Sequence, residues 1–338
     1  MALPVFSEAT LDDLLQRVFA DLIERGERIS PGKGPCREHF GSMIELQNPR
    51  ARLSRSEGKG KIFSALGETC WYLSGSDDAS AIKYYIKKHP EAPIERGRLR
   101  SAYGPRIFGA DDNDQIENVV KVLRRSQSSR RAVAQIFSAS DLAQAAHWNI
   151  EEQEPEVPCT CVLQFAIRKH QLCVTTYMRS NDVFRGLPHD IFAFTMIQEL
   201  VARRLGIDVG SYRHAVGSLH LYEADIENAN AYLREGWQSA KPMPSMPMSG
   251  NDEALKLLLK YESDLRSGTT LEPPFDLPDY WRDLAWLLFA FALSRLEDHE
   301  SAIARMSLIP SNLVSRVFDV HIADKIGAVT SELEATNR

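Results

Sequence analysis

The chain has 338 residues, 43% of them hydrophobic and 25% charged, which excludes disordered and fibrous proteins and provides for one large core or two smaller ones. Its formal net charge of −6 argues against a general nucleic-acid binder, because binding to a phosphate backbone requires a basic surface. The N-terminal segment lacks the pattern of a secretory signal, and the longest apolar run, Leu284 to Leu293, is too short to span a membrane and is better interpreted as a buried or dimer-facing helix.

The cysteines are odd in number and scattered, without the paired spacings of a metal site. They predict a cytoplasmic protein with free thiols, no bound metal, and room for one reactive cysteine. The five are Cys36, Cys70, Cys159, Cys161 and Cys173.

The N-terminal part begins with a predicted amphipathic helix. Thr10 offers an N-cap before apolar residues at helical spacing from Leu11 to Ile23, and Gly26 ends the pattern. The following stretch, 28-RISPGKGP-35, predicts a flexible surface loop that carries two cations.

The middle of the chain changes from helical to strand-like patterns. Segments 65–75, which Gly75 ends, and 79–89 predict helices. Two β-branched and aromatic runs, 161–168 and 172–178, predict a hairpin across Lys169, His170 and Gln171. Segment 188–205 predicts a helix that ends at Gly206, and 216–224 predicts a further strand.

The C-terminal part is set off by 241-KPMPSMPMSG-250, whose prolines predict a linker. Segments 251–265 and 279–298 beyond it are strongly helical in pattern. The expected organisation is an α+β catalytic domain over 1–240, a linker over 241–250, and a helical extension over 251–338 packed on the catalytic body.

Cys159 is the strongest candidate nucleophile. It follows Pro158 at the start of the predicted hairpin, and Arg179 lies one hairpin away, where its guanidinium is expected to lower the pKa of the thiol. On these residues alone, a buried structural cysteine is the competing interpretation.

A longer set of residues that includes Cys159 and Arg179 resembles the pattern of a known family. Pro158–Cys159, Gln164–Phe165, 179-RSNDVF-184, Gly186–Leu187–Pro188 and 220-HLY-222 together resemble, in identity, order and spacing, the thymidylate synthase family of folate-dependent pyrimidine C5-modifying enzymes. Weaker resemblance runs through 68-ETCWYLSG-75, Tyr103–Gly104 and 129-SRR-131. The resemblance implies an α+β fold with a thymidylate synthase-like mixed sheet and flanking helices, to which this chain adds a helical C-terminal segment.

The resemblance also implies how a pyrimidine nucleotide is held. Cys159 adds to C6 of the base, which makes C5 able to take a one-carbon unit from 5,10-methylenetetrahydrofolate. Arg179 and Ser180 bind the 5′-phosphate, and the partner subunit of a homodimer supplies Arg130 and Arg131.

The remaining roles follow position by position from the same resemblance. Arg28 or Lys33 adds a cation to the phosphate site, and Glu68 organises water and moves protons near the base. Asp182 lies against the folate. His220 and Tyr222 bind the sugar hydroxyls, and Tyr103 lies near the proton path.

The residue type at position 190 indicates which pyrimidine base the substrate carries. The family members that methylate uridylate carry an asparagine here, whereas the cytidylate hydroxymethylase branch carries an aspartate. A carboxyl group accepts a hydrogen bond from the exocyclic amine of cytosine and, when protonated, donates to N3. Asp190 therefore indicates a cytidylate and leaves CMP and dCMP as alternatives.

Several departures from the family pattern bear on the product. The chain has no tryptophan between His89 and Tyr103 and no matching closing tail, and both absences favour capture of the one-carbon unit by water rather than hydride. Thr160 replaces a histidine and Ser218 replaces an aspartate, but neither change removes a covalent or charge-bearing group named above.

The sequence therefore favours a homodimeric cytidylate C5-hydroxymethylase that uses methylenetetrahydrofolate. A uridylate methyltransferase is the nearest alternative, and Asp190 argues against it. A nucleotide-binding protein without turnover is the third interpretation, which the joint presence of Cys159, Glu68 and Tyr103 weakens.

Overall fold

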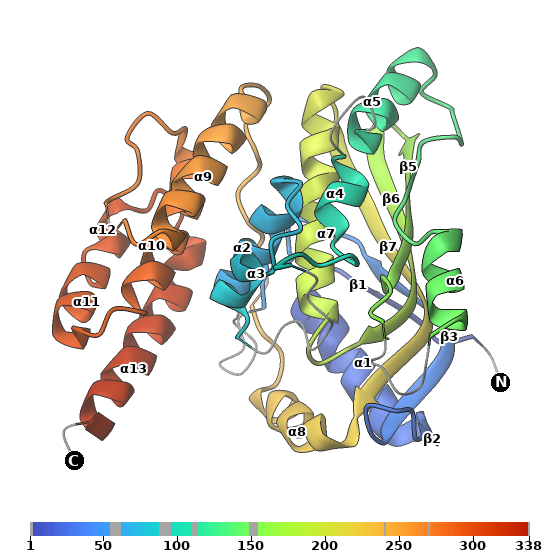
Figure 1. Ribbon diagram of the computed structural model, residues 1–338, viewed down its shortest axis with the longest axis horizontal. Coiled ribbons are helices and arrows are strands. Elements are labelled where there is room, and N and C mark those ends of the chain that lie inside the picture. The colour runs from blue at the N-terminus through green and yellow to red at the C-terminus, as the bar shows by residue number, and fades with distance from the viewer. Residues whose placement is uncertain are drawn as a thin grey trace.

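One mixed sheet lies at the centre of the fold, as the sequence predicted. In this computed structural model the described residues are 3–54, 62–87, 96–109, 114–148, 155–239, 241–269 and 271–336, and within them seven strands form the sheet in the order β1-β3-β7-β6-β5-β4, with β2 beside β3 (Figure 1). The strands are β1 (Val5–Glu8), β2 (Glu27–Ile29), β3 (Cys36–Leu46), β4 (Val133–Gln135), β5 (Thr160–Arg168), β6 (Gln171–Asp182) and β7 (Asp208–Tyr222). The β1–β3 and β6–β7 pairs are parallel, and the other pairs are antiparallel.

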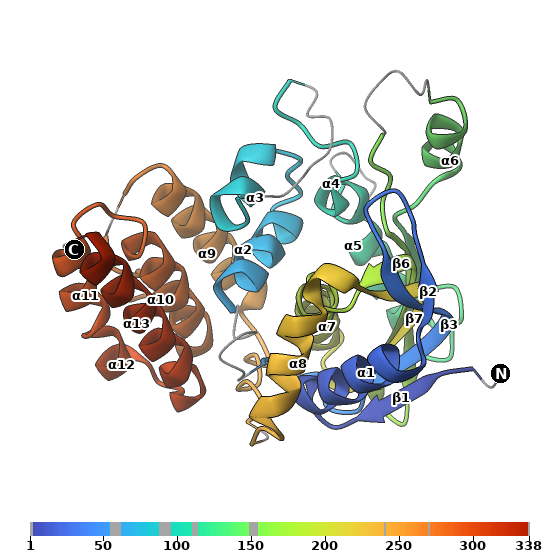
Figure 2. The same ribbon diagram turned by 90° about the horizontal axis from the view of Figure 1, so that it is seen from below.

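Helices cover one face of this sheet and form a separate bundle beyond it. The body carries α1 (Leu11–Arg25), α2 (Ile62–Leu73), α3 (Ala79–Tyr85), α4 (Tyr103–Ile107), α5 (Gln115–Arg125), α6 (Ala139–Ala146), α7 (Leu187–Arg204) and α8 (Ile226–Glu235), with a 3-10 turn η1 (Glu223–Asp225). The bundle carries α9 (Asn251–Arg266), α10 (Asp279–Leu293), α11 (His299–Met306), α12 (Ile309–Asn312) and α13 (Asp319–Thr336), with a turn η2 (Arg316–Phe318). Figure 2 shows α1 and α7 against the sheet and the bundle beyond α2 and α3.

The predicted hairpin is confirmed, and its second strand is longer than expected. Strands β5 and β6 pair in antiparallel register, with Arg168 opposite Gln171. The turn is therefore two residues long, and Lys169 and His170 both have positive φ angles of 50° and 59°, as a type I′ turn requires. Because β6 continues to Asp182, the residues from 179 to 182 lie in the sheet rather than in a loop.

The N-terminal predictions are confirmed in part. Helix α1 begins after Thr10, whose hydroxyl accepts a hydrogen bond from the backbone N–H of Asp13, and ends at Gly26. The loop predicted for 28–35 is wrong at its start, because Arg28 and Ile29 pair with β3 as part of β2. A three-residue strand is too short to show a periodic pattern, which explains the error.

Three other boundaries differ from the predictions. Helix α3 ends at Tyr85, before the predicted end at residue 89, which lies outside the described residues. The helix predicted over 279–298 breaks after Leu293, and a new helix begins where Asp298 caps the N–H of Ser301. Strand β7 starts well before residue 216. Gly210 interrupts the strand pattern of the sequence in this part of β7. A glycine stands there because a Cβ at this position would lie 2.6 Å from Cys173 Sγ.

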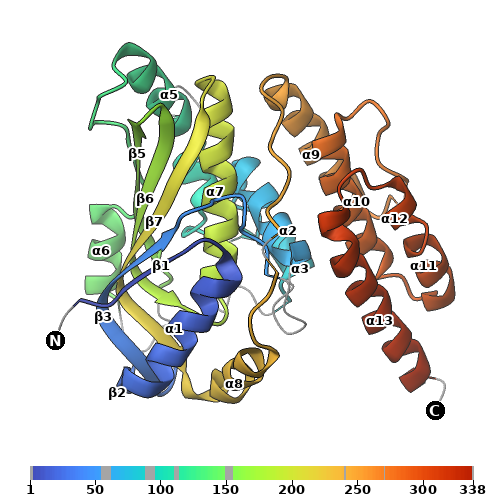
Figure 3. The same cartoon turned by 180° about the vertical axis from the view of Figure 1, so that it is seen from behind.

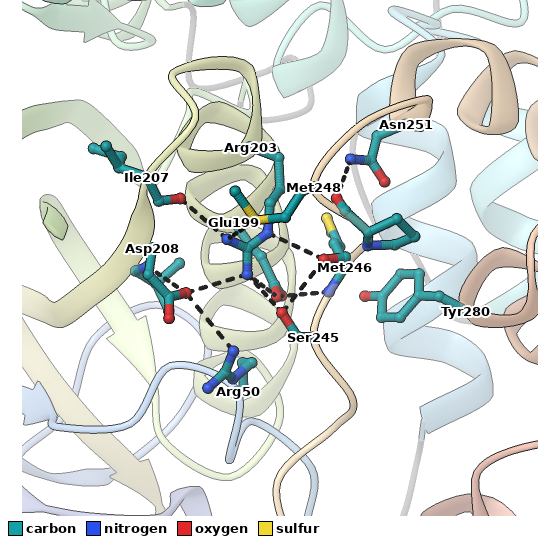
Figure 4. A network of polar contacts seen from close by, with 12 residues as sticks. Arg50, Glu199, Arg203, Ile207, Asp208, Ser245, Met246, Met248, Asn251 and Tyr280 are labelled. Atoms are coloured by element: carbon teal, nitrogen blue, oxygen red, sulfur yellow. Dashed lines mark hydrogen bonds and ion pairs between the residues drawn. The ribbon is translucent and has the colours of Figure 1, made fainter.

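The proline- and methionine-rich stretch 241–250, here named the strap, runs extended beside α7 (Figure 3). Met243 and Met246 are buried within it. The guanidinium of Arg203 donates to the carbonyl of Met246 at 3.1 Å and to Ser245 Oγ at 2.6 Å (Figure 4). Glu199 accepts from the backbone N–H of Met246 at 3.0 Å, so the strap is fixed to α7 by polar contacts at both backbone groups of one residue.

The apolar core has two main parts, and they meet at the helices that carry the candidate site. One part fills the space between the sheet and helices α1, α5 and α7. The other joins α2 and part of α7 to the helical bundle, and it includes every residue from Leu284 to Leu293. The apolar run of α10 is thus a buried helix. No helix within the described ranges is both long and apolar enough to cross a membrane.

Candidate active site

The candidate nucleophile lies where β5 begins, beside the arginine that the hairpin was expected to bring to it. The backbone N–H of Arg179 donates to the carbonyl of Cys159 at 2.9 Å. The guanidinium of Arg179 donates to the carbonyls of Pro158 and Val157, both at 3.0 Å. Arg179 therefore holds the backbone that leads into Cys159, in addition to placing a positive charge near the thiol.

The positive charge of Arg179 acts to lower the pKa of the Cys159 thiol, as expected, but the net shift is upward. Burial raises the pKa of the Cys159 thiol, because a thiolate loses more solvation than a thiol does. The positive charges of Arg179 and Lys33 act in the opposite direction but do not outweigh burial, and the Asp190 and Glu156 carboxyls add to the increase.

Asp190 lies in the first turn of α7 and is buried. Its Oδ2 accepts a hydrogen bond from Asn181 Nδ2 at 2.6 Å. Burial raises the pKa of Asp190 well above its ordinary value, the nearby Glu68 carboxyl raises it further, and the Asn181 hydrogen bond opposes both. The result favours the protonated form, which can donate as well as accept.

Glu68 projects from α2 into the same region, with polar partners on two sides. Tyr72, one helical turn later, donates its hydroxyl to Glu68 Oε1 at 2.6 Å. His189, which immediately precedes Asp190, places Nδ1 3.1 Å from Glu68 Oε2. The two buried carboxyls thus belong to helices that pack together and are joined by a histidine.

Tyr103 connects this carboxyl region to the nucleophile. Its hydroxyl accepts a hydrogen bond from the backbone N–H of Thr160, next to Cys159, at 3.2 Å. Its ring packs against Tyr72, with centroids 5.1 Å apart. Burial and the Cys159 charge raise the pKa of Tyr103 well above its ordinary value, so the hydroxyl keeps its proton.

The ends of β6 and β7 bring three further predicted residues together. Asp182 and His220 are neighbours in the parallel β6–β7 register, and the His220 and Tyr222 rings meet edge to face at 5.0 Å. Asp182 Oδ1 accepts from the backbone N–H groups of Phe184 at 2.8 Å and Arg185 at 3.0 Å, which closes the turn before α7. Burial raises the pKa of Asp182, although the His220 charge acts against this.

The cations predicted for the phosphate lie in different places. Lys33 is exposed and close enough to Cys159 to act on its pKa. Arg28 instead forms two hydrogen bonds with Glu223, at 2.7 and 3.1 Å. Ser180 follows Arg179 along β6 and pairs with Ser218 of β7.

Arg130 and Arg131 do not reach this site within one chain. Both are exposed, just before β4, and the adjacent Ala132 carbonyl accepts from the N–H of Phe165 at 2.8 Å. Phe165 lies six residues along β5 from Cys159, which corresponds to about 20 Å of extended strand. The backbone of the arginine pair therefore lies beside the middle of β5, several residues along the strand from the nucleophile.

Three site residues were not predicted from the sequence. Glu38 of β3 accepts a short hydrogen bond from the Ser218 hydroxyl. This places a carboxylate near His220, although Ser218 stands where the family pattern has an aspartate. Asn181 and His189 hold the two buried carboxyls. His189 and Asn181 both stand in the stretch that also carries Arg179 and Asp190, so its polar density was the available signal.

The arrangement suits covalent chemistry on an anionic ligand. It joins a thiol, two buried carboxyls and a tyrosine hydroxyl, and cations border it. Within the described ranges, no group of three or more potential metal ligands occurs.

A comparison with known families finds that the model described as thymidylate synthase matches residues 12–264, a range that includes the strap and most of α9.

Proposed function

The chain belongs to the thymidylate synthase family, and on that premise we propose that it hydroxymethylates C5 of a cytidine monophosphate, CMP or dCMP. The family transfers a one-carbon unit from methylenetetrahydrofolate to a pyrimidine nucleotide, so the chain is a one-carbon transferase of this kind. The observation that carries the choice of cytosine is the buried Asp190, whose surroundings favour a protonated carboxyl.

The proposed base recognition rests on complementary hydrogen bonding. Cytosine presents an acceptor at N3 and donors on its exocyclic amine, whereas uracil presents a donor at N3 and an acceptor at O4. A protonated Asp190 donates to N3 of cytosine and accepts from the amine. The Asn181 hydrogen bond supports this role because it fixes the orientation of the Asp190 carboxyl. Uracil is mismatched when the proton stays on the oxygen that faces N3, because the same acid with its proton on the other oxygen would pair with uracil.

Covalent activation begins at Cys159. Its thiol loses a proton, the thiolate sulfur bonds to C6 of the base, and the electron pair of the C5–C6 double bond moves to C5, which can then take the one-carbon unit. Loss of the C5 hydrogen as a proton breaks the bond between the transferred carbon and the folate nitrogen, so tetrahydrofolate leaves with that electron pair and an exocyclic methylene remains on C5. Water adds its oxygen to that carbon, its released proton passes to a base, and elimination of the Cys159 sulfur restores the double bond. Glu68 is the proposed base, and Tyr103 lies beside the path.

Water rather than hydride is proposed to complete the reaction for two reasons. The stretch after His89 has no tryptophan, although residues up to 95 lie outside the described ranges. The last described helix, α13, belongs to the bundle and lies away from the sheet and from the proposed nucleotide site (Figure 1). Neither feature provides the folate-side cover that would keep water from the methylene.

The folate is proposed to lie against Asp182. This side chain remains about 15% exposed, and its Oδ2 lies 3.9 Å from Arg185 Nε. A carboxylate oxygen in that position suits the N–H donors of a pterin ring, so the residues present fit the co-substrate. When bound, methylenetetrahydrofolate supplies the one-carbon unit.

The nucleotide sugar and phosphate are assigned by position in the family pattern. His220 and Tyr222 bind the sugar hydroxyls, while Arg179, Ser180 and a cation of the 28–35 segment bind the phosphate. Lys33 is preferred to Arg28 as that cation, because Arg28 is engaged by Glu223.

The active unit is proposed to be a homodimer in which Arg130 and Arg131 enter the partner's phosphate site. Their distance from Cys159 within one chain supports this assignment. The alternating pattern of β6 also leaves Tyr177 44% exposed on the sheet face opposite α7, where a second copy can pack.

The test is to incubate the protein with methylenetetrahydrofolate and, separately, CMP, dCMP or dUMP, and to determine product masses. A hydroxymethyl group gained by CMP or dCMP supports the proposal and identifies the sugar. A methyl group gained by dUMP would make the enzyme a uridylate methyltransferase. No product with any nucleotide, together with nucleotide binding that survives Cys159→Ser, would indicate a binding protein.

A further inference from the structure

His189 forms a polar bridge between the helix of Glu68 and the turn of Asp190. Its Nδ1 lies 3.1 Å from Glu68 Oε2, and its Nε2 lies 3.1 Å from Ser64 Oγ. Ser64 and Glu68 are one turn apart on α2, so a single ring contacts two successive turns of that helix. The side chains of His189 and Glu68 are only 15% and 10% exposed.

The hydrogen-bonding roles in this bridge follow from the partners. An ionised carboxylate only accepts, so the His189 nitrogen that faces Glu68 must carry a hydrogen. Tyr72 donates to the other Glu68 oxygen at 2.6 Å from within α2. The carboxylate thus has a hydrogen-bond donor on its own helix and a close polar contact on α7, which together oppose rotation about its terminal bond.

The position of His189 in the chain gives this bridge a functional meaning. Asp190, its neighbour, is the proposed reader of the base, and Glu68 is the proposed base for the attacking water. The two carboxyls must keep a fixed relation for water to be activated at the exocyclic carbon, because proton transfer requires hydrogen-bond distances. A histidine that contacts Glu68 and adjoins Asp190 ties these two groups together.

We propose that His189 is a positioning residue that donates from Nδ1 to Glu68 and aligns its carboxylate with the base held by Asp190. The inference rests on the proposed function for its chemical consequence. It assigns His189 no contact with the nucleotide, so loss of the bridge affects turnover rather than binding.

Three variants test the bridge. His189→Phe keeps a ring but removes both polar contacts, His189→Asn keeps an N–H donor close to the place of Nδ1, and Ser64→Ala removes the hydroxyl that contacts Nε2. We expect His189→Phe to lower kcat at least about tenfold and to change the nucleotide KM less than about threefold. His189→Asn is expected to restore kcat to within about threefold of wild type, and Ser64→Ala to remain at that level.

A second measurement, hydrogen exchange at C5 of the nucleotide without folate, tests the bridge independently of folate binding. Reversible addition of the Cys159 sulfur to C6 makes C5 basic. A group that delivers a deuteron to C5 and then removes the proton replaces the C5 hydrogen with deuterium from the solvent. His189→Phe is expected to slow this exchange without folate, and His189→Asn to preserve it. Thermal unfolding of each variant checks that the fold is retained.

The inference is overturned if His189→Phe turns over like wild type, if it changes only KM, or if His189→Asn is as impaired as His189→Phe. Failure of the proposed function is distinguishable, since the wild type would then give no product with any nucleotide. In that case the 13C carboxyl resonance of Glu68 decides the question. A positioning role requires that His189→Phe shift this resonance and that His189→Asn leave it near the wild-type value, and equal spectra for all three proteins overturn the inference.

Discussion

At the scale of single residues, the burial of Asp190 carries a cost in stability that its proposed role in base recognition would explain. Burial, and then the neighbouring Glu68 carboxyl, raise the pKa of Asp190 well above its ordinary value. Between the unfolded and folded pKa values the native state binds more protons than the unfolded state does. The contribution of Asp190 to stability therefore falls as pH rises through that interval.

Replacement of Asp190 by asparagine tests this electrostatic account. The amide has nearly the same shape and does not ionise, so we expect Asp190→Asn to gain stability relative to wild type as pH rises. Between about pH 5 and pH 8 the gain should approach about 1.4 kcal/mol for each pH unit that lies between pH 5 and the folded pKa, as urea unfolding at those two pH values would measure. Parallel stability curves for the two proteins would contradict a raised pKa.

Cys159 offers a second test at this scale. Arg179 is the largest influence that lowers the thiol pKa against burial, so Arg179→Met should raise that pKa further. We expect alkylation of Cys159 by iodoacetamide near neutral pH to slow roughly three- to tenfold, while Arg179→Lys, which keeps the charge, slows it less. Peptide-resolved mass spectrometry across pH measures both, with Cys173 as an internal control. A faster reaction in Arg179→Met would show that access, not charge, limits this thiol.

At the scale of elements, the strap depends on a buried ion-pair network. Arg203 and Glu199 are almost fully buried on successive turns of α7, and Arg52 forms an ion pair with Glu199 from the other side. Breaking such a pair leaves a buried charge without compensation. We expect Arg203→Met to lower the free energy of unfolding by about 3 to 5 kcal/mol and to expose the strap to proteases.

A matched control for this prediction is Arg234→Met on α8. Arg234 pairs with Glu227, and both side chains are mostly exposed. An exposed ion pair contributes about 0 to 1 kcal/mol, so urea unfolding should barely change. An equal effect of the two substitutions would mean that the strap contacts do not depend on the buried network.

The elements also show which parts of the fold the sequence predicts. Helices α1 and α7 and the β5–β6 hairpin are long and periodic, or joined by a two-residue turn, so local patterns identify them. Strand β1 pairs in parallel with β3, with Val5 opposite Met43, and that pairing has no local signal. The short β2 and β4 are set by their neighbours in the sheet rather than by their own residues.

The same distinction applies to the candidate site. The motif residues between Cys159 and Tyr222 follow from sequence because the family pattern keeps their order and spacing. The contacts of Glu68 with His189 and of Ser218 with Glu38 join residues more than 100 positions apart. Only tertiary packing brings them together, so the carboxylate near His220 and the bridge to Glu68 could not be predicted from spacing.

At the scale of the whole molecule, the helical bundle and the candidate site share α2. Glu68 lies on that helix, whose apolar residues pack in the same core as α10. Phe63, for example, stacks on Phe291 at 6.4 Å between ring centroids. The bundle thus supports the back of the helix that presents Glu68, which gives the C-terminal segment a structural connection to the chemistry.

The proposed dimer makes the sharpest prediction at this scale. If Arg130 and Arg131 act in the partner's site, then a chain with Cys159→Ser and a chain with both arginines changed to alanine should complement each other. One site of the mixed dimer combines an intact Cys159 with intact partner arginines, and its other site carries both defects. Random reassembly of equal amounts should restore about a quarter of wild-type activity, because half the dimers are mixed and each has one working site.

The predicted recovery is measured as the activity of the mixture relative to that of each parent protein. Arginines that served the site of their own chain would leave both sites of every mixed dimer defective, and no activity would return. A matched mixture of Cys159→Ser with Arg179→Ala provides the control, since Arg179 touches the backbone beside Cys159 in the same chain. That pair should not complement, so recovery in the first mixture alone would assign the exposed arginines to the neighbouring subunit.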